Sequence, residues 1–449
     1  MKKSENSIWR FFASVKLALF TLLILSVTSI IGTLIPQKNP PDFYLQEYGA
    51  NMARFFQTLD VPNMYNSWWF VSLLFLFSVN LIVCTIDRLP NVWRMVVMDN
   101  LDTPSDRLEK MPQKRVFYSE ADQETTARTV GEQMSEGGWK PQSLARETET
   151  LLFAQKTPWS RLGVYGVHLS ILIIFAGAII GSLAGYRGSV MIPEGDSTDT
   201  VYEHITSRPI PLGFTVQCDE FGITYYDDGA TPKEFRSVLT IKDPQQAAPY
   251  TSPIIVNDPL THKGVTFYQS SYQPLQGFHT VITNRSTGAT QTFRVPFGEK
   301  ISWTGTSVEF GIINQQQRSR MGNVSHVKIW FSDGQGESSS FWMADKSSQT
   351  IVRPSGEYDF AVKQIYATGL QATKDPGVWT VYFGCLLMLL GLYAAFFLSH
   401  RRIWVTVRTD GNRSRVLLCG TSSKNTFDFE KDFNALSARL EKNPAFVSE

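Results

Sequence analysis

The stretch GVYGVHLSILIIFAGAIIGSLA, residues 163–184, decides the fold class because it joins a membrane-length apolar run to a histidine, His168. About 20 apolar residues in a helix cross a hydrocarbon core of ~30 Å. An ionisable side chain inside such a span is rare and costly, so His168 indicates a functional site. The alternative interpretation is a histidine that only packs against a neighbouring helix through a hydrogen bond.

Three other apolar runs of similar length lie along the chain. We therefore predict an α-helical membrane protein with four spans, at 17–35, 68–86, 163–184 and 378–399. The first run is too long for the apolar core of a signal peptide, and no A-x-A cleavage site closes it. The mean hydropathy of −0.12 hides these runs, because two long polar regions dilute them.

Basic residues gather on one side of the predicted spans. Arg88 follows the second span, Arg161 precedes the third and Arg401 follows the fourth. The positive-inside rule predicts that these flanks and both termini are cytoplasmic, in a multi-pass protein of the cell (inner) membrane. The loop 36–67 and the long segment 186–375 are then extracytoplasmic.

The two polar regions differ in pattern. Segment 186–375 alternates apolar and polar residues in short runs between Gly, Pro, Asn and Asp clusters, which predicts a large all-β domain of sandwich or barrel type. Segment 87–160 has a strand–helix–strand pattern and predicts a small α+β insert. The predicted order is an N-terminus (1–16), first span (17–35), loop (36–67), second span (68–86), insert (87–160), third span (163–184), β domain (186–375), fourth span (378–399) and tail (400–449).

Composition argues against several classes of function. The 42 basic and 41 acidic residues give a net charge of +1 with no basic tract, so nucleic acid is not an expected partner. The four cysteines form no CxxC pair, which disfavours thiol redox chemistry and structural zinc. The sequence has no CxxCH motif, so we expect no covalently attached haem. No pattern of nucleophile, base and metal ligands suggests that the chain alone makes bonds.

Several stretches together carry a resemblance to a known family. They are SVKLALFTLLILSVTSIIGTLIPQ (14–37), YNSWWFVSLLFLFSVNLIVCTIDRLPNVW (65–93), YYDDGATPKEFRSVLTI (225–241) with IIVNDPLTHKGVTFYQSSYQP (254–274), and KDPGVWTVYFGCLLMLLGLYAAFFLSHRRIWV (374–405). In this order and spacing the chain resembles the ResB family, also called CcsB, of System II cytochrome c biogenesis. It lacks a tryptophan-rich WWD segment, so it resembles the separate subunit and not a fusion with its partner.

The resemblance implies a function. It implies a membrane subunit that works with a second membrane protein of the CcsA or ResC type. Together they would bring haem b across the membrane and deliver it to the CxxCH thiols of apocytochrome c, as parts of a cytochrome c synthase. A rival interpretation is a membrane-anchored scaffold or assembly factor for that complex, which binds no haem itself.

The resemblance also implies that a histidine in a transmembrane helix ligates haem iron, and His168 is the matching position. Neutral imidazole is a good iron ligand, and coordination would explain why the residue is tolerated in lipid. His168 lies seven residues after Arg161, about 10 Å along a helix, which places it toward the cytoplasmic leaflet. The second axial ligand is expected from the partner.

Two further positions are weaker candidates. Asp375, in KDPG at the outer end of the fourth span, could contact the partner or a haem propionate through Lys374. Its alternative role is a helix cap before Pro376. His262, in NDPLTHKG, could contact haem or apocytochrome c, and is otherwise one of several lone exposed histidines of the β domain, with His204, His279 and His326.

Glycine spacing predicts how the third and fourth spans pack. Gly177, Gly181 and Gly185 form a small-residue row that opposes His168 on its helix, so we expect this row to pack a helix of this chain. His168 would then face a groove or the partner. The seven-residue recurrence at 377, 384 and 391 predicts a close crossing in the fourth span. His400 is expected in the basic flank.

Overall fold

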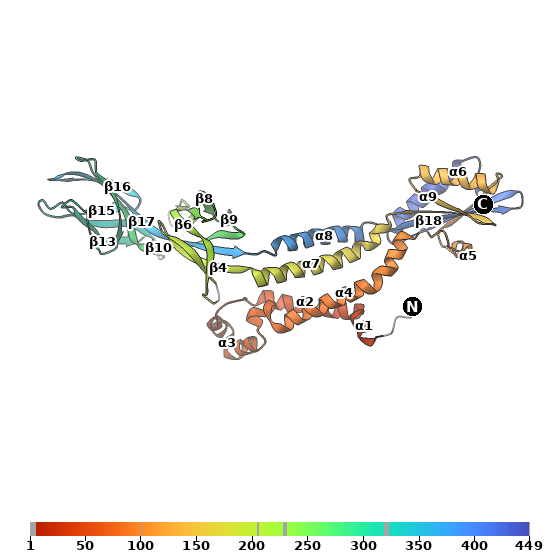
Figure 1. The fold of residues 1–449 in the computed structure, drawn as a ribbon, viewed down its shortest axis with the longest axis horizontal. Coiled ribbons are helices and arrows are strands. Elements are labelled where there is room, and N and C mark those ends of the chain that lie inside the picture. The colour runs from red at the N-terminus through yellow and green to blue at the C-terminus, as the bar shows by residue number, and fades with distance from the viewer. Residues whose placement is uncertain (1–5, 99, 204–205, 228–230, 318–322, 449) are drawn as a thin grey trace. The chain divides into compact units, whose positions relative to one another are not determined.

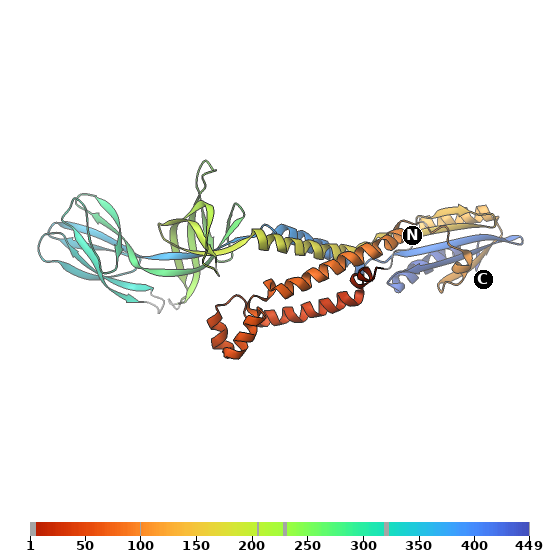
Figure 2. The same cartoon turned by 60° about the horizontal axis from the view of Figure 1, so that its bottom comes forward.

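The structure is a computed structural model that describes the chain except residues 1–5, 99, 204–205, 228–230, 318–322 and 449. Part of the predicted N-terminal segment and His204 therefore lie outside the described residues. The chain divides into two compact units (Figures 1 and 2). One unit comprises Met1–Ala178 with Val378–Glu449, and the other comprises Ile179–Gly377.

Four helices in the described ranges are long and apolar enough to cross a membrane, which confirms the four predicted apolar helices. They are α2 (Val15–Leu34), α4 (Trp68–Val97), α7 (Gly163–Ala184) and α8 (Val378–Phe396). Helix α4 continues to Val97 through Pro90, well beyond the predicted end of the apolar run. The polar residues after Ile86 end the hydrophobic pattern, but they do not end the helix.

The predicted loop 36–67 is largely helical. It contains α3 (Pro41–Thr58), broken at Gly49 by a φ of 77°, and the 3-10 helix η1 (Val61–Asn66). A short helix, α1 (Ser7–Phe12), precedes α2, and a 3-10 helix, η2 (Pro158–Leu162), leads into α7. Proline at the first position of α3 suits a helix start, because its missing N–H has no partner to lose there.

Helices α7 and α8 cross closely at glycines. A Cβ on Gly391 would lie 2.9 Å from the Val167 nitrogen, and one on Gly384 would lie 3.1 Å from the Ser170 oxygen, so only glycine fits there. This confirms the predicted close crossing for these two positions, while Gly377 precedes the helix.

The glycine row predicted on α7 packs differently from the expectation. Gly163 meets the backbone of α8, because a Cβ there would lie 2.6 Å from the Ala395 nitrogen. A Cβ on Gly181 would instead meet the Asp375 carboxylate, and one on Gly185 would meet the Lys374 oxygen. The contact of α7 with α8 therefore runs from Gly163 past His168 to Ser170 and Ile174, and does not follow the Gly181 and Gly185 side.

The unit Ile179–Gly377 is the large β domain that the alternating pattern predicted. A ten-stranded sheet has the order β11-β10-β17-β4-β5-β6-β7-β8, with β16 paired to β17 and β9 to β10, and a four-stranded sheet has the order β12-β13-β14-β15. Its strands are β4 (Tyr186–Pro193), β5 (Ser197–Glu203), β6 (Pro209–Tyr225), β7 (Pro232–Lys242), β8 (Tyr250–Ile255), β9 (Leu260–His262), β10 (Val265–Asn284), β11 (Thr290–Pro296), β12 (Lys300–Ser302), β13 (Glu309–Gln317), β14 (Val324–Ser332), β15 (Ser339–Ala344), β16 (Ser347–Arg353) and β17 (Gly356–Lys374).

Two apolar cores fill the β domain, and the long strands β10 and β17 contribute to both. Phe267 and Leu370 belong to one core, while Phe278 and Phe360 belong to the other. The two strands pair in antiparallel register along almost their whole length.

The insert and the tail form one α+β domain, although the sequence suggested two separate parts. Its six-stranded sheet has the order β2-β3-β18-β19-β1-β20. The elements are α5 (Ser105–Glu109), β1 (Lys114–Ser119), α6 (Gln123–Glu136), β2 (Gln142–Ala145), β3 (Glu149–Lys156), β18 (Arg401–Asp410), β19 (Arg413–Ser422), α9 (Thr426–Lys442) and β20 (Val447–Ser448). One core joins Phe117 and Leu152 of the insert to Val405 and Phe433 of the tail, so neither segment encloses a core alone.

Candidate functional site

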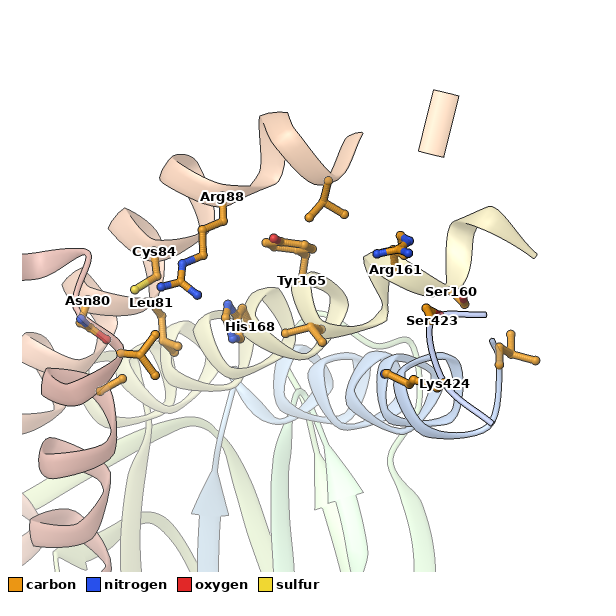
Figure 3. Close-up of a pocket in the computed structure, with 15 residues that line it drawn as sticks. Asn80, Leu81, Cys84, Arg88, Ser160, Arg161, Tyr165, His168, Ser423 and Lys424 are labelled. Carbon is orange, nitrogen blue, oxygen red and sulfur yellow. The ribbon is translucent and has the colours of Figure 1, made fainter. Parts of the chain in front are cut away.

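A pocket of about 480 Å³ lies among α2, α4, α7 and the segments that follow α8 and β19. His168 lines this pocket. Figure 3 shows the polar side chains that share it. Those used below are Cys84, Arg88, Arg161, Tyr165, His168 and Lys424.

His168 is half-buried and contacts α4 directly. Its Nδ1 lies 3.1 Å from Thr85 Oγ1, and its ring lies edge-on to Tyr165 with 6.1 Å between centroids. When Thr85 accepts a hydrogen bond from Nδ1–H, Nε2 carries the lone pair. Nε2 makes no hydrogen bond to the described residues, so it is available to a ligand. The bond to Thr85 is also what a packing histidine would make.

Helical spacing puts the polar residues on two facing stripes. Arg161, Tyr165 and His168 follow one another at intervals of four and three residues along η2 and α7, which places them on one side. Cys84 and Arg88 are four residues apart on α4 and line the pocket from the opposite helix. Figure 3 shows the Arg88 and His168 side chains between the two helices.

The pocket is cationic. Arg88, Arg161 and Lys424 line it, and no Asp or Glu does so among the described residues. Lys424 Nζ donates to the Ala395 carbonyl at the end of α8. The Arg88 side chain makes no hydrogen bond or ion pair with the described part of the chain. The pocket therefore offers positive charge that no carboxylate among its described lining residues neutralises.

Arg161 is held in place by His400. Arg161 Nε–H donates to His400 Nδ1 over 2.7 Å, and His400 Nε2–H can then donate to Gln155 Oε1 over 2.8 Å. Burial, helped by the nearby charges of Arg161 and Arg402, lowers the pKa of His400 to about 4. His400 is fully buried within the predicted basic flank, where it contacts Arg161.

Asp375 takes the geometry of a cap. Its Oδ1 accepts a hydrogen bond from the Gly377 backbone N–H at 3.0 Å, just before α8 begins at Val378. Neither Asp375 nor His262 is among the residues that line the pocket. A role of either residue toward haem stays a prediction.

His262 is buried in the β domain, and the expectation of a lone exposed histidine is wrong for it. Its Nε2 lies 2.9 Å from Asp243 Oδ2, and its Nδ1 lies 3.3 Å from Tyr250 Oη. A hydrogen bond from Lys263, helped by the Gln245 backbone N–H and His262, lowers the pKa of Asp243 to about 2. Both ring nitrogens thus have partners, and the residue fastens β9.

The other histidines of the β domain give no metal site. His279 is half-buried, which lowers its pKa, and His326 is exposed. Within the described ranges, no group of three or more His, Cys, Asp and Glu side chains is placed to hold a metal ion.

Sequence reasoning missed the participation of Arg88, Thr85 and His400 in the site region. Arg88 was assigned only to a basic flank, because the apolar run of its helix ends at Ile86. The four-residue spacing of Cys84 and Arg88 was a signal that both lie on one side of a helix. The structure shows that this helix continues past Pro90. No sequence signal links His400 to Arg161, which precedes it by 239 positions.

Comparison with known proteins gives a consistent result. The model of the ResB-like family matches residues 15–352 and 328–434. A protein of Gloeobacter violaceus named cytochrome c biogenesis protein CcsB is 29% identical over 460 residues, which cover 97% of this chain and 93% of the relative. The protein of the same name from Trichormus variabilis is 28% identical, with coverage of 96% and 92%. Cytochrome c biogenesis protein Ccs1 of Porphyra purpurea is 25% identical, with coverage of 96% for both chains.

Proposed function

The chain belongs to the ResB-like family, and from this membership we propose that it is the haem-handling membrane subunit of a cytochrome c maturation complex. Its relatives are named for cytochrome c biogenesis, and the similarity covers nearly the whole chain. The observation that carries the proposal is the His168 pocket, where an imidazole with an unengaged nitrogen lies beside uncompensated positive charge.

The proposed orientation follows from the order of the elements. If α7 and α8 both cross the membrane, the β domain between them lies on one side and the α+β domain lies on the other. Arg88, Arg161 and Arg401 flank the spans at the α+β end, so the positive-inside rule makes that end cytoplasmic. The β domain is then extracytoplasmic, where apocytochrome c is matured.

Haem b is the proposed cargo, and His168 the proposed ligand of its iron. A neutral imidazole held by Thr85 through Nδ1 would present Nε2, as metal-binding histidines do when a neighbour fixes their tautomer. The pocket lies toward the proposed cytoplasmic side, where haem would arrive. The chain itself supplies binding and orientation, so its contribution to thioether formation is proximity.

A partner of the CcsA or ResC type completes the proposal. It would supply the second axial ligand and the external haem site. The β domain would hold the partner or shield the haem while the CxxCH thiols of apocytochrome c reach it. Asp375 and His262 remain weaker candidates for contacts at that stage.

A scaffold that binds no haem is the second candidate, and one observation favours it. The hydrogen bond between His168 and Thr85 would hold two helices together without any ligand. In that case the pocket would be filled by lipid or by the partner.

The visible spectrum of the detergent-purified complex separates the two candidates. We expect the Soret band per protein to fall sharply in His168→Ala and to return in part when imidazole is added. His326→Ala is the matched control, because that side chain is exposed in the β domain. An unchanged Soret band in His168→Ala would refute the ligand role and favour the scaffold.

A further inference from the structure

We infer that Arg88 and Arg161 form a carboxylate-binding subsite in the His168 pocket, which holds the two propionates of the porphyrin that His168 binds. This inference rests on the proposed function, because it names the part of the ligand that the pocket recognises. It assigns to two arginines of this chain the selection of an acidic porphyrin over a neutral one.

The state of Arg88 is the first argument. Arg88 lies two residues after the apolar run ends at Ile86, and its exposed side chain lines the pocket. Arg88 has no hydrogen bond or ion pair with the described residues, and no acidic side chain among them lines the pocket. A carboxylate brought by a ligand would supply the missing partner and could accept two parallel hydrogen bonds.

The orientation of Arg161 is the second argument. Its Nε–H donates to His400, which fixes the plane of the guanidinium. A guanidinium has five N–H donors, so four remain, and none of them is bonded to the described residues. Lys424 adds a third positive charge to the lining. Three positive charges are more than one carboxylate would neutralise, so the lining suits a ligand with two carboxylates.

The spacing is the third argument. Arg161, in η2, precedes His168 of α7 by seven residues, a rise of about 10 Å. Apolar side chains occupy the lining between them and across from them, including Val164 and Leu81. A ligand that reaches both ends must have an apolar body, a group that imidazole can bind, and acids along one edge. Haem b meets this description, since its two propionates lie on one edge of the ring.

The test compares haem with its dimethyl ester, which keeps the iron and the ring but has no carboxylates. Each is titrated into the complex in phosphatidylcholine nanodiscs that hold no anionic lipid, and the Soret band gives the affinity. We expect wild-type protein to bind the ester at least tenfold more weakly than haem. Arg88→Gln should weaken haem binding by about tenfold and leave the affinity for the ester unchanged, whereas Arg88→Lys should restore part of the loss.

Controls separate this inference from the proposed function. Arg94→Gln removes a charge from the same helix outside the pocket and should change neither affinity. The Soret position in Arg88→Gln should stay that of wild type, because His168 still ligates. Arg161→Gln should behave as Arg88→Gln does, and Arg161→Lys is the second variant because Arg161 also anchors His400.

Two results would overturn the subsite. One is equal affinity of the wild-type protein for haem and for the ester, a measurement that needs no variant. The other is that Arg88→Gln weakens the binding of haem and of the dimethyl ester by the same factor. This holds also if the weaker binding follows the release of a bound phospholipid. Neither result affects the role of His168. Conversely, an unchanged spectrum in His168→Ala with a preserved preference for haem would refute the ligand role of His168 and support only the recognition of the propionates by the two arginines.

Discussion

Arg161 Nε–H donates to His400 Nδ1 over 2.7 Å, and this bond ties the entry of α7 to the start of the tail segment. The acceptor must be unprotonated, since an imidazolium has no lone pair to offer. The position of Arg161, which lines the pocket, therefore depends on the protonation state of His400, which does not line it.

Acid should weaken this connection. The pKa of His400 is about 4 when folded, below its usual 6.5, so the stability that the neutral ring contributes is full above about pH 6.5 and is lost as the pH falls toward 4. The loss is roughly 3 kcal/mol at most. The melting temperature in detergent should fall between pH 7 and pH 5, and less steeply in His400→Gln. Equal slopes for the two proteins would contradict this role.

The crossing of α7 and α8 should not tolerate a methyl group at Gly391. Its Cβ would lie 2.9 Å from the Val167 nitrogen and 3.0 Å from the Gly163 oxygen, both backbone atoms that cannot turn aside. Gly391→Ala should cost about 1–3 kcal/mol, seen as a lower melting temperature. Gly166→Ala is the matched control, because its Cβ would meet the same helix at an ordinary 3.6 Å. Equal melting temperatures would refute the tight contact.

The α+β domain should fail as a whole when its tail is damaged. Phe433 of α9 is buried in the core shared with Phe117 of the insert. Phe433→Ala should cost about 3–5 kcal/mol and make the insert, 87–160, sensitive to limited proteolysis. Phe427→Ala, whose side chain is 76% exposed, should leave proteolysis unchanged. Cleavage confined to the tail would show that the two segments fold independently.

His262 should matter for the β domain and not for the haem spectrum. Both of its ring nitrogens have partners, Asp243 and Tyr250, so neither is free to bind iron in this arrangement. His262→Phe should lower the melting temperature and keep the Soret band of the complex. A lost band in a protein that still assembles would instead favour the weaker candidate role at His262.

The sequence predicted the elements that local patterns determine. Four apolar runs became four apolar helices, because hydropathy over about 20 residues is enough to identify them. Alternation predicted the β domain for the same reason. Gly384 and Gly391 predicted the close crossing, since glycines seven residues apart lie on one side of a helix and let another backbone approach closely.

What could not be predicted depends on residues far apart in the chain. β3 pairs with β18, and no local pattern in the insert signals a partner beyond the β domain. The burial of His262 and His400 has the same origin, because each is covered by residues from other elements. The sequence predicted only a loop at 36–67, where the break at Gly49 divides α3 into two short helical stretches. For the pocket, the sequence predicts that His168 faces a groove or the partner, but it indicates only a topological role for the arginines that share the pocket.

The strand order of the α+β domain also determines when the domain can fold during synthesis. β18 and β19 stand in the middle of the sheet, between β3 and β1, yet they are synthesised only after the whole β domain and α8. The insert lacks the central strands of its sheet until the β domain and α8 have been synthesised. The sheet can therefore be completed only after α8 has been synthesised. A chain that stops before β18 leaves the apolar core of the insert without the tail residues that cover it.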